Sequence, residues 1–209
     1  MAGDLYRWLV DGARGDPADG HVLACMLAHA WSDTEPSLAL TLGLAPAELA
    51  AMMDEVFPHA AFLVAGLPGD GQGPQAIEEP DLRALLIEHG TRGAPIERWL
   101  AHILARRSLG ANHLWQDLGL AGRGDLSGLL KRHFAPLAVR NDRDMKWKKF
   151  FYRELCEREG VSICKAPSCE ICTDFSLCFG AEDGEPLARL AWSPIRQGPS
   201  RKELPPCVN

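Results

Sequence analysis

Apolar residues in the N-terminal part of the chain recur at the three- and four-residue spacing of an amphipathic helix. Leu5, Trp8 and Leu9 follow this spacing, and so do the apolar residues between Val22 and Ala30. We therefore expect residues 1–64 to form an N-terminal helical region.

Proline and glycine divide this helical pattern. Pro46 and Pro95 each precede an amphipathic run, and proline suits the first turn of a helix, where its missing N–H group is not needed. Residues 65–80 contain four glycines and three prolines and predict a flexible loop. The sequence leaves open whether this loop separates two domains or lies within one.

Helical spacing resumes after this loop and continues through a second region, residues 81–180. Residues 111–118 predict a short helix that ends at Gly119. Asp125 is in a suitable place to cap the next helix, which continues to Phe134.

A further helix is expected to begin at Asn141 or Asp142 and to end at Gly160. No segment alternates apolar and polar residues as a strand does. The sequence thus predicts a mainly α fold: a helical bundle-like domain, then a cysteine-rich metal-cluster loop at residues 164–178, then an extended or disordered tail at residues 181–209.

Composition narrows the functional classes. The chain has 209 residues, of which 46% are hydrophobic and 24% charged, with a net charge of −6. This acidic balance argues against general nucleic-acid binding. There is no apolar run of about 18 residues and no signal-peptide pattern at the N-terminus, so we expect no membrane span and a cytoplasmic location.

The distribution of cysteine is the most informative feature. Seven cysteines occur in the chain, and four of them lie within one segment at spacings of four, two and five intervening residues. In a reducing compartment such clustered thiols favour metal binding over disulfides. The four are Cys164, Cys169, Cys172 and Cys178.

An iron–sulfur-type cluster is the favoured interpretation of this segment. The first three cysteines match the opening spacing of plant-type ferredoxins. A structural zinc site usually draws cysteine pairs from separate segments, whereas here all four thiols share one loop. A redox pair of Cys169 and Cys172 lacks the strand–helix context of that motif. Zinc, a redox pair and four unrelated cysteines remain as alternatives.

Three motifs in this order resemble the NifQ proteins of nitrogen-fixing bacteria. They are HLWQDLGL at residues 113–120, the run from Asn141 to Arg153 containing MKWKKFFYR, and the cysteine array followed by Phe179 and Gly180. The resemblance covers roughly residues 80–180.

The resemblance implies a role in nitrogen fixation. NifQ-like proteins are expected to carry a molybdenum–iron–sulfur cluster, or a 4Fe–4S precursor of it, on the four cysteines. They would act as metallochaperones and not as enzymes. They would donate molybdenum to the scaffold on which the nitrogenase iron–molybdenum cofactor is assembled, and the nitrogenase iron protein would take part. Molybdate or another molybdenum source would load them.

Five further residues are secondary candidates. Lys146, Lys149 and Arg153 share one helix face, which either attracts molybdate, docks an acidic partner surface, or simply faces solvent. His113 is either an extra metal ligand or proton donor, or a hydrogen-bonded residue at a helix start. Cys156 is either a spare ligand or transfer thiol, or a small buried residue.

Overall fold

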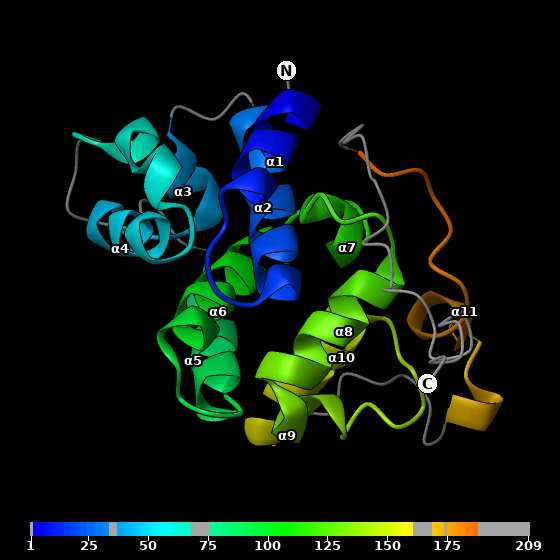
Figure 1. The fold of residues 1–209 in the computed structure, drawn as a ribbon. Helices are drawn as coiled ribbons and strands as arrows, with labels where there is room; N and C mark the ends of the chain where they lie inside the picture. The colour runs from blue at the N-terminus through cyan, green and yellow to red at the C-terminus, as the bar shows by residue number, and fades with distance from the viewer. Residues whose placement is uncertain (1, 34–36, 68–75, 161–168, 174, 188–209) are drawn as a thin grey trace, which may run out of the picture.

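The regular structure of the chain is helical throughout the part that the structure describes (Figure 1). The computed structural model describes residues 2–33, 37–67, 76–160, 169–173 and 175–187. The prediction of a mainly α fold is therefore confirmed. In chain order the helices are α1 (Ala2–Asp11), α2 (Pro17–Trp31), α3 (Leu38–Leu42), α4 (Pro46–Val56), the 3₁₀ helix η1 (Pro58–Val64), α5 (Glu79–Glu88), α6 (Pro95–Arg107), α7 (Leu114–Asp117), α8 (Arg123–His133), α9 (Ala135–Ala138), α10 (Trp147–Arg158), the 3₁₀ helix η2 (Cys169–Ile171) and α11 (Phe175–Cys178).

Helix α2 lies at the centre of the N-terminal half. Every residue from Gly20 to Ala30 is buried, which is the pattern of a helix surrounded by other elements. Helices α1, α3 and α8 all contact it. The helix begins at Pro17 because the Asp16 carboxylate, one residue earlier, accepts a hydrogen bond from the Ala18 N–H group at 2.8 Å.

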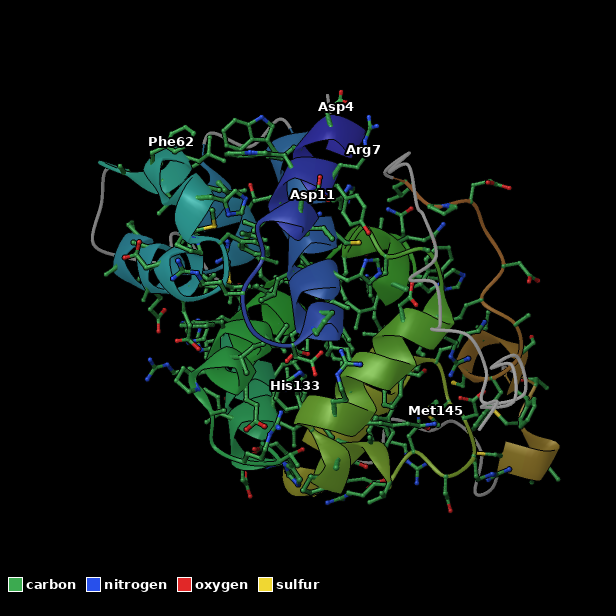
Figure 2. The ribbon with its side chains drawn as sticks, in the orientation of Figure 1. Asp4, Arg7, Asp11, Phe62, His133 and Met145 are labelled. Carbon is green, nitrogen blue, oxygen red and sulfur yellow. The ribbon has the colours of Figure 1, made fainter. Side chains whose placement is uncertain are left out.

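A buried polar contact joins α2 to α8. His133, labelled in Figure 2, is fully buried, and its Nε2 lies 2.8 Å from Oδ1 of Asp19. The same carboxylate oxygen accepts a hydrogen bond from Arg132 Nη2 at 3.2 Å. Because both donors belong to α8, Asp19 fixes that helix against α2.

The start of α6 depends on a buried carboxylate. Glu97 accepts hydrogen bonds from the backbone N–H groups of Arg92, Gly93 and Ala94 at 3.1, 2.7 and 3.3 Å. A carboxylate stabilises the N-terminus of a helix because the exposed N–H groups there carry partial positive charge. The helix begins at Pro95, as the sequence predicts.

The predicted starts of α7 and α8 are wrong. Helix α7 begins at Leu114 and not at residue 111, because the Asn112 side chain turns to donate a hydrogen bond to Asp117 at 3.0 Å. Helix α8 begins at Arg123 after an extended Gly122, so Asp125 lies in its first turn and not at the cap. An acidic residue favours either position, which is why the sequence alone does not separate them.

The end of α7 is where the sequence places it. Gly119 has φ +70°, and a Cβ atom there would lie 2.4 Å from the Cβ of His29. Only glycine combines this left-handed backbone with so close an approach. The HLWQDLGL motif thus includes a residue required by the packing of α7 on α2.

Helix α10 begins later than predicted. It starts at Trp147, because the Asn141 side chain both accepts from the Met145 N–H group and donates to the Met145 carbonyl, each at 2.8 Å. These two bonds close a loop in which Asp144 has φ +55°. The helix ends just before Gly160, which has φ +67° and is the predicted stop.

The aromatic face of α10 completes the hydrophobic core. Trp147, Phe150 and Phe151 are buried, and the Trp147 indole donates a hydrogen bond to Ser127 of α8 at 3.0 Å. The same core contains side chains from both sides of the predicted loop at residues 65–80, and it extends to Phe179 at the end of the cysteine segment. Residues 68–75 of that loop lie outside the described part of the chain. Within the described residues, no helix is long and apolar enough to cross a membrane.

Three buried histidines make the stability of the fold sensitive to acid. Burial lowers the pKa of His21, His29 and His102 from the ordinary value of 6.5. Below pH 6.5 these histidines bind protons in the unfolded chain but not yet in the folded chain. The stabilisation is therefore complete above pH 6.5 and is lost as the pH falls through the lowered folded-state values. We expect the free energy of unfolding, measured with urea at a series of pH values, to decrease below about pH 6.5.

The variant His102→Gln serves as the control for this prediction. His102 donates from Nδ1 to the Gly43 carbonyl at 3.1 Å, and a glutamine amide can replace that donor without titrating. The decrease in unfolding free energy should be shallower in this variant. If the unfolding free energy changed equally with pH in the variant and the parent, burial of His102 would make no contribution to the acid sensitivity.

Candidate metal centre

The structure places three of the four predicted cysteine ligands on one short segment. Cys169 begins η2, and its carbonyl accepts a hydrogen bond from the Cys172 N–H group at 3.3 Å. Cys178 ends α11. Cys164 lies outside the described residues, so the four-thiolate ligand set itself stays a prediction.

The thiols at these three positions are available for chemistry. Cys169, Cys172 and Cys178 are partly exposed, and Cys169 and Cys178 also pack against the edge of the core. Among the residues that the structure describes, no group of three Cys, His, Asp or Glu side chains stands at metal-binding geometry. The described part therefore supplies soft donors on one surface segment, and a closed site would need Cys164 or further closure of the segment.

Cys25 differs from the array in its environment. It is buried in α2 near His21, and burial raises the pKa of its thiol to about 12. A metal ligand must be the thiolate form. Cys25 thus stays a neutral core residue, in line with its position outside the array.

The N-terminal end of α10 anchors the cysteine segment. The Lys146 N–H group donates to the Cys178 carbonyl at 2.8 Å, and the Lys146 ammonium donates to the Ser176 carbonyl at 3.0 Å. Lys146, a predicted secondary residue, therefore contacts the segment directly. The segment sits beside a helix end whose N–H groups carry partial positive charge.

Aromatic stacking fixes the same segment from the other side. The Phe175 and Phe179 rings are stacked with centroids 4.5 Å apart, and Phe179 is buried. The Arg143 guanidinium lies over Phe179, 5.4 Å from the ring centroid. Cys178 is thus held between a ring that belongs to the core and the first turn of α10.

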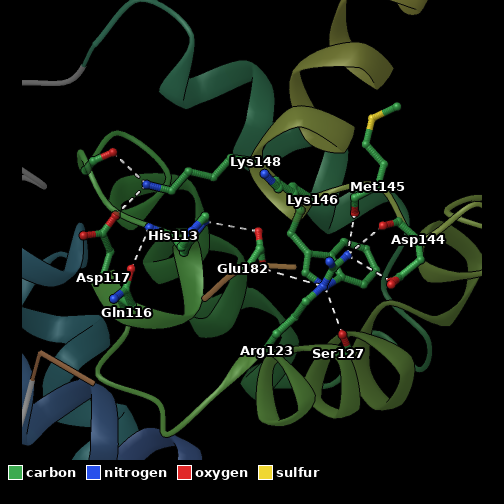
Figure 3. Close-up of polar contacts among 12 residues, drawn as sticks. His113, Gln116, Asp117, Arg123, Ser127, Asp144, Met145, Lys146, Lys148 and Glu182 are labelled. Carbon is green, nitrogen blue, oxygen red and sulfur yellow. Dashed lines mark hydrogen bonds and ion pairs between the residues drawn. The ribbon is translucent and has the colours of Figure 1, made fainter. Parts of the chain in front are cut away.

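A buried carboxylate ties down the chain beyond the cysteines (Figure 3). The Glu182 side chain is only 3% exposed, although its neighbours in sequence are exposed. Its oxygens lie 3.5 Å from His113 Nδ1 and 3.5 Å from Arg123 Nε. Arg123 also donates to the Asp144 and Met145 carbonyls at 3.0 and 2.9 Å, which links Glu182 to the turn before α10.

Residues 182–185 therefore form a strap across α7 and α8. Besides the Glu182 contacts, the Gln116 side chain donates to the Glu185 carbonyl at 2.9 Å. His113, a predicted extra metal ligand or proton donor or simply a hydrogen-bonded residue at a helix start, lies 3.5 Å from Glu182 in this strap. Its functional role stays a prediction.

Asp117 joins α6, α7 and α10. Its carboxylate lies 2.5 Å from the Lys148 ammonium and accepts a hydrogen bond from Asn112 at 3.0 Å, while its backbone carbonyl accepts from Arg107 Nε at 2.5 Å. The side chains of Asp117 and Lys148 are 9% and 18% exposed. A charge pair so deeply placed orients α10 strongly, because either partner alone would be a buried charge.

The remaining secondary candidates lie further along α10. Lys149 is exposed, and the Arg153 guanidinium is 2.6 Å from Glu157 on the same helix. Cys156 is a free, partly exposed thiol. The functional roles of Lys149, Arg153 and Cys156 stay predictions.

The sequence interpretation did not identify five residues of this site: Gln116, Asp117, Arg123, Lys148 and Glu182. Gln116 and Asp117 were detectable, because they are polar residues inside the otherwise apolar motif HLWQDLGL. Lys148 does not belong to the helix face that Lys146, Lys149 and Arg153 share. Glu182 carries no local signal, since its burial arises only from contact with α7 and α8.

Comparison with known proteins gives a consistent result. The family model named NifQ matches residues 22–180. The chain is 41% identical over 170 residues to the Protein NifQ homolog of Sinorhizobium fredii, covering 80% of this chain and 74% of that protein. It is 42% identical over 166 residues to Protein NifQ of Rhodobacter capsulatus, covering 78% and 88%. It is 51% identical over 106 residues to Protein NifQ of Azotobacter vinelandii, covering 50% and 54%. No solved structure matches at a significant level.

Replacing Asp117 tests the anchoring of α10. We expect Asp117→Asn to lower the free energy of unfolding by about 2–4 kcal/mol, because the Lys148 charge loses its partner in a largely dry environment. The double variant Asp117→Asn/Lys148→Met removes both charges and should recover most of that loss. Urea unfolding of the parent, the single variants and the double variant measures the coupling, and additive losses would contradict it.

Replacing Glu182 tests the strap. In Glu182→Gln the carboxylate charge is lost while the side-chain shape is kept, and we expect faster amide hydrogen exchange at Phe179 and at Lys146. Glu185→Gln is the matched control, because Glu185 contacts Gln116 only through its backbone carbonyl. Equal exchange rates in the two variants would show that the Glu182 carboxylate does not hold the segment.

Proposed function

This chain belongs to the NifQ family, and on that premise we propose that it carries a molybdenum–iron–sulfur cluster and donates molybdenum to the iron–molybdenum cofactor of nitrogenase as that cofactor is assembled. The cluster is cargo, held by Cys164, Cys169, Cys172 and Cys178. The protein acts in nitrogen fixation as a metal carrier and not as an enzyme. Its acceptors are the cofactor assembly scaffold and the nitrogenase iron protein, and molybdate or another molybdenum source loads it.

One observation supports this proposal most directly. Cys169, Cys172 and Cys178 are partly exposed thiols on a segment that is fixed at one end by the hydrogen bond from the Lys146 N–H group to the Cys178 carbonyl, 2.8 Å long. Thiolates are the protein ligands that suit iron and molybdenum in sulfide clusters. Partial exposure allows a donor to release its metal, while the fixed end holds Cys178 beside the start of α10.

Electrostatics at the segment favour an anionic occupant. Thiolate-bound sulfide clusters carry negative charge, which backbone N–H groups and nearby cations stabilise. The first turn of α10 and the Lys146 ammonium lie beside Cys178 and Ser176. The same features would stabilise a 4Fe–4S precursor before molybdenum is added.

The metal content of the protein tests the proposal. We expect protein purified without oxygen from molybdenum-replete cells to contain iron and molybdenum by mass spectrometry and to absorb visible light. Iron without molybdenum, together with reversible one-electron chemistry, would indicate an electron-transfer or regulatory iron–sulfur protein instead. Zinc alone, with no visible absorption, would indicate a zinc-stabilised interaction module.

Cysteine variants separate cluster binding from folding. Cys169→Ala should lose the bound metal and the visible absorption while it keeps the helical circular dichroism of the parent, because the core lies in α2, α6, α8 and α10. Cys156→Ala is the matched control, since Cys156 is also a partly exposed free thiol but lies outside the array. Unfolding of Cys169→Ala would point to a structural metal, and metal loss from Cys156→Ala would add that thiol to the ligands.

A further inference from the structure

The cysteine segment exposes more apolar surface than its own packing requires. Ile171, Phe175 and Leu177 are 67%, 42% and 58% exposed. All three lie between or beside the cysteines, on η2 and α11, at the outer edge of the molecule (Figure 1). Three exposed apolar side chains of this size within seven consecutive residues are more typical of an interaction surface than single ones, which are common everywhere.

Basic residues border these apolar side chains. Arg143 lies over Phe179, which in turn stacks on Phe175, and the Lys146 ammonium donates to Ser176 between Phe175 and Leu177. Lys149 is exposed three positions further along α10, on the same helix face as Lys146. The adjoining turn also carries two exposed acidic residues, Asp142 and Asp144, and Asp144 is 2.9 Å from Arg123, which offsets its charge.

We propose that Ile171, Phe175 and Leu177, edged by Arg143, Lys146 and Lys149, form a docking surface for an acceptor protein. The acceptor would present an apolar depression bordered by carboxylates, because that surface complements both the apolar centre and the basic edge. This inference rests on the proposed function: it describes how the acceptor would recognise the cysteine segment from which it takes the metal.

The geometry gives this docking surface a chemical purpose. Its apolar residues are interleaved with Cys169, Cys172 and Cys178 along the chain, so a protein that covers them also covers the thiols. Contact there would exclude water from the metal ligands during transfer. The basic edge would speed association with an acidic partner, an effect that salt weakens.

Binding of the assembly scaffold tests the docking surface. The probe is the purified iron–molybdenum cofactor assembly scaffold, titrated with the full-length, cluster-loaded protein by isothermal titration calorimetry. We expect Ile171→Ser/Leu177→Ser to weaken binding by at least about tenfold while iron and molybdenum contents equal those of the parent. Lys149→Glu should slow association and reduce its dependence on salt.

The matched control is Phe62→Ser/Ile77→Ser. Phe62 and Ile77 are 67% and 93% exposed, and Figure 2 shows Phe62 on the opposite side of the molecule from Met145, which precedes α10. This variant should bind like the parent. Parent-like binding by Ile171→Ser/Leu177→Ser, or equal weakening in both double variants, would overturn the proposal.

Two further outcomes keep the inference separate from the proposed function. Self-association of the parent that Ile171→Ser/Leu177→Ser abolishes, detected by sedimentation, would identify a second copy of this chain as the occupant and overturn the proposal. A parent protein that contains no molybdenum but still binds the scaffold through these residues would contradict the proposed cargo and leave the docking surface supported.

Discussion

The position of the cysteine segment depends on one buried charge pair, that of Asp117 and Lys148. The two side chains are 2.5 Å apart and mostly shielded from water, so an orientation of α10 that separated them would leave a buried charge unpaired. Because α10 is fixed, so is its first turn, where Lys146 bonds to the Cys178 carbonyl. A contact between two short motifs thus determines where a distant group of thiols is presented.

This arrangement suits a protein that must both hold and release a metal. The base of the segment is firm, since Phe179 belongs to the hydrophobic core and Glu182 is buried between His113 and Arg123. The part that carries the thiols is partly exposed. Release then requires little disturbance of the helical core, which has its own stabilising contacts in Asp19, Glu97 and the aromatic face of α10.

Local sequence rules succeeded where one interaction dominates and failed where two compete. Pro46 and Pro95 begin helices and Gly119 ends one, because the missing N–H group of proline and the φ freedom of glycine are properties of single residues. Asn141 was expected to cap α10, yet its side chain closes a loop onto Met145 instead. Both uses are available to an asparagine, and only the surrounding chain decides between them.

The sequence by itself determined the helical class, the family and the candidate ligands, because helical periodicity, motif order and cysteine spacing are written along the chain. It did not determine how the cysteine segment is held. Glu182 looks like any charged tail residue, and Arg123, Gln116 and Lys148 look like ordinary polar positions on helices. Their roles arise from contacts between residues far apart in sequence, such as Gln116 with Glu185 and Lys148 with Asp117. Burial is a property of the packed molecule, and only the tertiary structure could turn these side chains into the support of the cysteine segment.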